Sequence, residues 1–165
     1  MTARGAHFAI EEDDARRLLA AVGDDERLQE IVVEEIEESS DRQHQFDHDK
    51  AWDALHRCFG DGTLNAGTGE RPLNLCFFGG RMLNQESFDF VVLLEPSEVR
   101  EVAAALAPVT ESWLRERYDS LDFLDYRQGK SDEDFRYTWT SFDGLPEFFS
   151  RAAREGRWVI FTMSQ

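Results

Sequence analysis

Apolar residues recur at helical spacing along most of the chain, and in a few short runs they are contiguous. The helical spacing predicts six helices, over residues 11–22, 24–38, 49–59, 96–107, 110–118 and 146–155. The contiguous or alternating runs predict strands over residues 6–10, 88–94 and 158–163. Helices therefore outnumber strands and separate them along the chain.

Residues with known preferences for helix ends support these boundaries. Asp24 or Asp25 is placed to cap the second helix, Thr110 caps a later one, and Gly23 ends the first. Pro96 and Pro146 each stand at the start of a helix, where proline is favoured. The boundaries are thus predicted by local chemistry as well as by apolar spacing.

Three segments are less well defined by their patterns. Residues 73–78 form either a short helix, because Pro72 precedes them and Gly79 follows, or a strand, because they are rich in aromatic residues. Residues 131–142 form a seventh helix if Ser131 caps it, although residues 137–140 are poor helix formers. Residues 39–45 are predicted to be a polar link.

The elements together predict an α/β or α+β fold in which six to seven helices cover a small mixed sheet of three to four strands. Neighbouring strands are too distant in sequence for hairpins, so we expect crossover connections and some parallel pairing. The length of 165 residues suits one domain, and no linker divides it. The predicted unit therefore spans residues 1–165.

One helix carries an unusual face. Trp52, Leu55, His56 and Phe59 follow the spacing i, i+3, i+4 and i+7, which gathers an imidazole among three large apolar groups. We expect Trp52 to point inward. His56 is either a buried histidine bonded to a backbone carbonyl or a residue that lines a pocket.

The order of short motifs resembles the YfbM-like family of small bacterial proteins of unknown function. The matching segments are Phe8-Ala9-Ile10 before an acidic helix, Asp49-Lys50-Ala51-Trp52-Asp53-Ala54-Leu55-His56, Pro72-Leu73, Gly79-Gly80, Leu94-Glu95-Pro96-Ser97-Glu98-Val99, Ala105-Leu106, Thr110-Glu111, Arg117-Tyr118-Asp119 and residues 148–156. The resemblance implies a single α/β domain and supplies no catalytic residue. Residues 126–142 are more acidic and irregular than the family pattern, which leaves the helix there open.

The charge is strongly negative and unevenly distributed. The net charge is −16, and residues 24–38 alone hold eight acids against one base, Arg27. Such a chain repels nucleic-acid phosphates and anionic lipid head groups, and no apolar run approaches the ~20 residues of a membrane span. The acidic helix is either a solvated face or a docking surface for a basic protein. The residues of this candidate partner surface are Asp24, Asp25, Glu30, Glu34, Glu35, Glu37 and Glu38.

Other motifs give little support to a specific chemistry. His44 and His48 have the spacing of two metal ligands on a helix, but Gln45 replaces the general-base glutamate of a zinc protease. Residues 60–71 form a glycine-rich loop without the lysine of a phosphate-binding loop, so a flexible connection or a lid is favoured. Cys58 and Cys76 lack zinc-ligand spacing. We therefore expect no metal and no cofactor.

Two functional hypotheses follow. The first is a non-enzymatic cytoplasmic binding module whose acidic surface engages a basic protein, for example as an immunity protein or inhibitor. The second is an enzyme or small-molecule sensor with a pocket near residues 60–71. The candidate pocket residues are Asp49, Trp52, Asp53, His56, Gly79 and Gly80. No catalytic residue, substrate or oligomeric state follows from the sequence.

Overall fold

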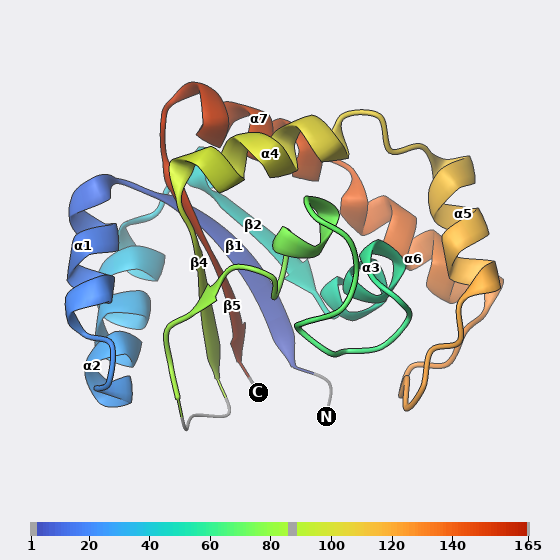
Figure 1. Cartoon of the computed structure of the whole chain (residues 1–165), viewed down its shortest axis with the longest axis horizontal. Helices are drawn as coiled ribbons and strands as arrows, with labels where there is room; N and C mark the ends of the chain where they lie inside the picture. The colour runs from blue at the N-terminus through green and yellow to red at the C-terminus, as the bar shows by residue number, and fades with distance from the viewer. Residues whose placement is uncertain (1–2, 86–88, 165) are drawn as a thin grey trace.

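A five-stranded sheet forms the centre of the molecule. The computed structural model of the chain describes residues 3–85 and 89–164. The strands pair in the order β2-β1-β5-β4-β3, and every pair is antiparallel (Figure 1). Their bounds are β1 Arg4–Ile10, β2 Gln45–Asp49, β3 Arg81–Met82, β4 Phe90–Leu94 and β5 Trp158–Ser164.

Helices cover both faces of this sheet (Figure 1). One face carries α1 Glu12–Ala20, α2 Asp25–Glu30 and the π-helical segment η1 Ile31–Glu37, which continues α2 without a break. The other face carries α3 Trp52–Phe59, α4 Pro96–Leu106, α5 Glu111–Ser120, α6 Asp132–Phe142 and α7 Leu145–Arg154. Two short 3₁₀ turns, η2 Arg42–His44 and η3 Leu73–Leu75, connect elements. No helix within the described ranges has the length and apolarity needed to cross a membrane.

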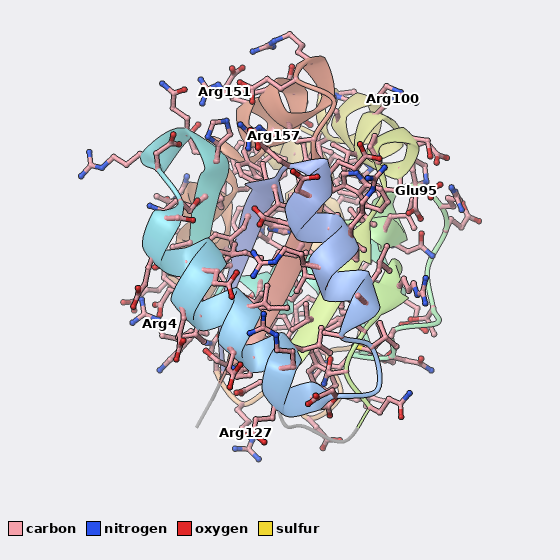
Figure 2. All side chains as sticks on the ribbon, turned by 90° about the vertical axis from the view of Figure 1, so that its left-hand side faces the viewer. Arg4, Glu95, Arg100, Arg127, Arg151 and Arg157 are labelled. Atoms are coloured by element: carbon pink, nitrogen blue, oxygen red, sulfur yellow. The ribbon has the colours of Figure 1, made fainter. Side chains whose placement is uncertain are left out.

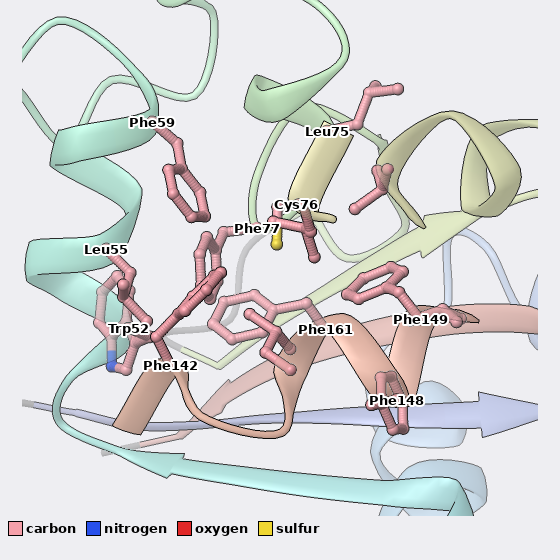
Figure 3. Close-up of a cluster of buried hydrophobic side chains, with 14 of the residues drawn as sticks. Trp52, Leu55, Phe59, Leu75, Cys76, Phe77, Phe142, Phe148, Phe149 and Phe161 are labelled. Atoms are coloured by element: carbon pink, nitrogen blue, oxygen red, sulfur yellow. The ribbon is translucent and has the colours of Figure 1, made fainter. Parts of the chain in front are cut away.

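The sheet separates two hydrophobic cores, because side chains alternate between its faces. In β5, Val159 and Phe161 face the core under α3–α7, whereas Ile160 faces the core under α1 and η1. Figure 3 shows the first of these cores, where Trp52, Phe77 and Phe161 gather. Contiguous apolar runs in β4 and β5 are therefore explained by burial on both faces.

The indole of Trp52 packs against β1 at Gly5. Its indole is 3% exposed, and Nε1–H donates to the Ala3 carbonyl oxygen at 2.8 Å. A Cβ at Gly5 would lie 2.6 Å from the indole ring, so this contact requires glycine. The expectation that Trp52 points inward is confirmed.

The predicted sheet differs from the observed one in strand number and direction. Five strands are present in the described residues instead of three to four, and the expected parallel pairing is wrong. Two helical passes, α1 and then α2–η1, connect β1 to β2. The second pass reverses the first, so β2 starts at the same end of the sheet at which β1 ended. An even number of passes gives antiparallel neighbours, whereas the expected parallel pairing requires an odd number.

The local predictions had mixed outcomes. Residues 45–49, where no strand was predicted, form the edge strand β2, and the helix predicted from residue 49 begins at Trp52. Residues 73–75 form a 3₁₀ turn, as the helical alternative proposed, and the doubtful helix is present as α6 with Ser131 as its N-cap. The predicted strand start at residue 88 lies outside the described residues. The mixed α/β character of the prediction is confirmed.

Candidate functional site

The acidic layer, defined as α1, α2 and η1 with their flanking residues 11–38, covers one whole face of the sheet (Figure 2). It contains 12 acids and three arginines. Each arginine is paired within the layer: Arg16 with Glu12 at 3.1 Å, Arg27 with Glu30 at 3.0 Å, and Arg17 with Glu35. The layer therefore keeps an excess of nine carboxylates after its own bases are engaged.

The structure divides the seven predicted partner-surface residues into two groups. Three have structural contacts: the Asp24 side chain accepts from Arg27 N at 3.0 Å, Asp25 from Gln85 N at 3.1 Å, and Glu35 lies beside Arg17 and Arg27. The others are exposed on the helix: Glu30, which is paired with Arg27, and Glu34, Glu37 and Glu38. Partial burial of its carboxyl raises the pKa of Glu37. The layer thus presents a row of carboxylates along one continuous helix.

The π-helical segment η1 sets the spacing of this row. Its seven residues place Ile31, Val32 and Ile36 in the core and Glu34 and Glu37 in solvent. The wider π-turn differs from the α-helical spacing assumed in the prediction, although its apolar residues are still buried. π-Helical segments are rare, and π-bulges within α-helices are frequently found at functional sites. The sequence carries no signal that distinguishes this segment from an α-helix.

The predicted pocket residues lie in or beside packed regions. The side chain of His56 is 2% exposed and contacts the Phe78 ring edge to face at 4.9 Å, and the backbone of Leu64 and Asn65 covers it. A Cβ at Gly79 would lie 2.3 Å from the Asn74 carbonyl oxygen, and one at Gly80 would lie 2.7 Å from the Leu93 oxygen. Four hollows on the described surface are lined by other residues. A ligand at His56 therefore requires residues 60–71 to move, and the pocket stays a prediction.

The two aspartates of the predicted pocket serve different contacts. Asp49, at the end of β2, accepts from the Tyr137 hydroxyl at 2.7 Å and pairs with Arg4 at 3.4 Å. Asp53 is 6% exposed, and its carboxylate accepts from Arg57 Nε at 2.6 Å. Burial raises the pKa of Asp53, and Arg57 opposes that shift. The structure therefore brings Asp53 to a buried ion pair and not to the imidazole of His56.

Arg57, which sequence reasoning missed, connects the loop that contains Gly62 to the loop that contains Leu124. Its side chain is 1% exposed, and Nη1 donates to the carbonyl oxygens of Gly62 at 2.9 Å and Leu124 at 2.7 Å. Its guanidinium also lies over the rings of Phe123 and Tyr126. The i, i+4 spacing from Asp53 is the one local signal. Gly62 lies in the loop that follows α3, whereas Leu124 is contributed by a loop 67 residues away.

A pair of buried histidines was also missed. His7 Nε2 lies 2.6 Å from the Cys76 carbonyl oxygen, which only accepts, so this nitrogen carries the proton. His7 Nδ1 therefore accepts from His48 Nε2 at 2.6 Å. Within the described residues, His48 Nδ1 has no hydrogen-bond partner. Phe77, Phe149 and Phe161 surround the pair, so burial lowers the pKa of His7 to about 4.

This arrangement separates the two histidines that had metal-ligand spacing. His48 belongs to β2 and points into the core, whereas His44 lies in η2 between the carboxylates of Asp41 at 2.8 Å and Glu155 at 2.9 Å. Across residues 3–85 and 89–164, no group of three or more His, Cys, Asp or Glu side chains is arranged to hold a metal ion. The prediction that the protein uses no metal or cofactor stays a prediction.

The comparisons with known proteins agree with this architecture. A family model described as a domain of unknown function (DUF1877) matches residues 1–162. The chain belongs to the DUF1877 family. Among solved structures it is similar to YfbM, a protein of unknown function from Escherichia coli, with 19% identity, a TM-score of 0.71, and coverage of 98% of this chain and 99% of that one. The family match confirms the expected family of unknown function, and the likeness to YfbM shows that the fold is the same. No curated protein matches the chain.

Both cysteines of this DUF1877 protein should be unreactive while it is folded. Burial raises the pKa of Cys58 to about 12, raises that of Cys76 well above its usual range, and blocks access to both sulfur atoms. We expect an aromatic disulfide reagent to modify both thiols at least 100-fold more slowly in buffer than in 6 M guanidinium chloride. Rapid modification of either thiol in the native protein would contradict the packing described here.

Proposed function

We propose that this DUF1877 protein is a non-enzymatic binding module whose acidic layer docks a basic protein. The observation that carries the proposal is the excess of nine carboxylates on one face, where all three arginines are already paired within the layer. A basic partner would supply the missing countercharge. An immunity protein or an inhibitor in the cytoplasm is one concrete form of this proposal.

The arrangement of the layer supports long-range attraction of a basic protein, to whose binding free energy each carboxylate contributes little. Carboxylates of one sign on a single face create a field that accelerates association with a positively charged surface. Individual exposed ion pairs contribute only about 0–1 kcal/mol, so several must act together. The interaction is therefore expected to weaken steeply as salt rises.

The experiment compares two triple variants with equal losses of charge. The first replaces three exposed carboxylates of the acidic layer, Glu26→Gln, Glu34→Gln and Glu38→Gln. The control replaces three exposed glutamates on the opposite side of the sheet, Glu70→Gln, Glu116→Gln and Glu133→Gln. A partner is captured from the source cells at low salt, purified, and titrated calorimetrically against the wild type and both variants.

We expect a basic partner whose Kd rises at least tenfold for the acidic-layer variant and less than threefold for the control. Affinity of the wild type should fall between 50 mM and 500 mM salt. Equal losses for the two variants would show that overall charge, and not this face, is responsible. Failure to capture any basic protein at low salt would overturn the proposal.

A further inference from the structure

A small hollow lies at the end of the acidic layer where α1 begins. Its volume is about 260 Å³, and it lies between the carboxyl end of β1, the first turn of α1, the end of η1 and the start of β5. Figure 2 shows Arg157 at this end of the layer. The lining residues are Ala9, Ile10, Glu11, Asp14, Ile36, Ser39, Ser40, Asp41, His44 and Arg157.

The lining is divided into apolar and polar parts. Ile10 and Ile36 contribute hydrocarbon, whereas Glu11, Asp14 and Asp41 contribute carboxylates. Ala9 contributes its carbonyl oxygen, which Arg157 contacts. A long cationic side chain has the same division, since lysine and arginine cover apolar surface with their methylene stems and keep the charge in a polar setting. The hollow is smaller than the pockets of about 300–1,000 Å³ that take drug-sized ligands, so it suits a single side chain.

Two further features favour a cation here. The acidic helix ends at the hollow, with Ser40 N donating to the Ile36 carbonyl oxygen at 3.0 Å, and the C-terminal end of a helix attracts positive charge. Arg157 of this chain already places its guanidinium there, with Nη1 3.4 Å from the Ala9 carbonyl oxygen and Nη2 3.7 Å from Glu11 Oε1. The hollow therefore accommodates one guanidinium within the fold itself.

Two of the lining carboxylates, those of Glu11 and Asp14, make only long ion pairs. Glu11 lies 3.7 Å from Arg157, and Asp14 lies 3.5 Å from Arg17, both longer than a strong charged hydrogen bond of about 2.7–2.9 Å. Asp41 is engaged more closely, since it accepts from the backbone of Gln43 and His44 and lies beside the His44 ring. The side chains of Glu11 and Asp14 are therefore free to turn toward an incoming donor, whereas the Asp41 side chain is held in place by its hydrogen bonds.

We propose that this hollow receives the side chain of one lysine or arginine from the basic partner, with its stem on Ile10 and Ile36 and its charge between Glu11 and Asp14. The inference rests on the proposed function, for which it supplies a point of specificity. The acidic layer attracts the partner at long range, and the hollow selects the residue that is buried on contact.

The first test uses single blocked amino acids, so it does not depend on finding the partner. Nα-acetyl-lysine N-methylamide and the corresponding arginine compound are titrated into ¹⁵N-labelled protein. We expect saturable shifts of the amide signals of Ile10, Ile36 and Ser40. The blocked norleucine compound, which has a similar stem without charge, should shift them at least fivefold less at equal concentration. Absence of saturable shifts with both cationic compounds would overturn the inference.

The second test compares two double variants in the first turn of α1. Glu11→Gln with Asp14→Asn neutralises the hollow, and Glu12→Gln with Asp13→Asn removes the same charge from the same turn outside it. Each pair loses one ion pair within the helix, Asp14–Arg17 or Glu12–Arg16, and the hollow variant also loses the contact of Glu11 with Arg157. We expect the hollow variant to lose the lysine-induced shifts and the control to keep them.

The captured partner then distinguishes the two proposals. A Kd raised at least tenfold by the hollow variant and less than threefold by its control supports the inference. Equal, small effects of both double variants, with a large effect of the triple variant of the acidic layer, would leave the proposed function standing and overturn the hollow as its specificity site. Thermal unfolding of all variants controls for loss of the fold.

Discussion

Acidification from pH 7 to pH 5 should destabilise this protein by several kcal/mol, well before its carboxylates are protonated. Burial lowers the pKa of His7 and His56 to about 4 and lowers that of His48 well below its usual value of 6.5. Above pH 6.5 both the folded and the unfolded chain hold these rings neutral. Below it the unfolded chain binds protons that the folded one excludes, so stability falls as pH falls toward 4.

The size of the effect follows from the number of rings. Each excluded proton lowers the free energy of unfolding by about 1.4 kcal/mol per pH unit, so three histidines together give about 4 kcal/mol per unit. Whole domains are stable by only about 5–15 kcal/mol. Asp53 acts in the opposite sense, because its raised pKa favours the folded state on acidification. The three histidines still dominate.

Urea unfolding at pH 7, 6 and 5 measures this dependence. His56→Leu removes one ring from a site in the core, and we expect the loss of stability per pH unit to fall by about a third in this variant. The other two thirds of the pH dependence come from His7 and His48. Their other nitrogens are engaged, so an added proton can enter only at His48 Nδ1, and no acceptor for it lies among the described residues. A free energy of unfolding that stays constant between pH 7 and 5 would refute the buried, neutral assignment.

Replacing Arg57 with methionine should cost about 3–5 kcal/mol of stability, because it leaves the Asp53 carboxylate buried without its partner. The carbonyl oxygens of Gly62 and Leu124 lose their donor as well. Urea unfolding measures the loss. Protease cleavage within residues 60–71 or 121–131 should also become faster, since Arg57 joins these loops.

Two variants control for this prediction. Arg115→Met breaks exposed ion pairs with Asp119 and Asp132, and we expect a loss of less than about 1 kcal/mol. Asp53→Leu combined with Arg57→Met removes both buried charges and should be more stable than Arg57→Met alone. Equal losses for Arg57→Met and Arg115→Met would show that burial of the ion pair has no energetic consequence.

Much of the helical framework could be predicted because helix signals are local. Thr110, Ser131 and one of Asp24 and Asp25 were identified as candidate N-caps from side-chain chemistry. Asp24, Thr110 and Ser131 each accept the backbone N–H three residues ahead. Trp52 was expected to point inward from its spacing alone, and it does. Such features depend on residues within one turn of each other, so the order of residues is enough to reveal them.

The edge strand β2 shows why the sheet was harder to predict. Only Phe46 and His48 of its five residues turn toward the core, and the others are Gln45, Asp47 and Asp49. A short alternation with charged outer positions resembles a polar link until β1 is placed beside it. Pairing of residue 8 with residue 45 and of residue 7 with residue 46 supplies the hydrogen bonds that stabilise the strand.

The chain by itself determined its family, its α/β character, the inward face of α3 and the concentration of carboxylates in residues 24–38. Tertiary structure alone decided the antiparallel sheet order, the histidine pair 41 residues apart, the loop anchor at Arg57 and the hollow between α1 and η1. The difference is physical. Apolar spacing and capping act between near neighbours, whereas strand pairing and the satisfaction of buried polar groups depend on which distant segments meet.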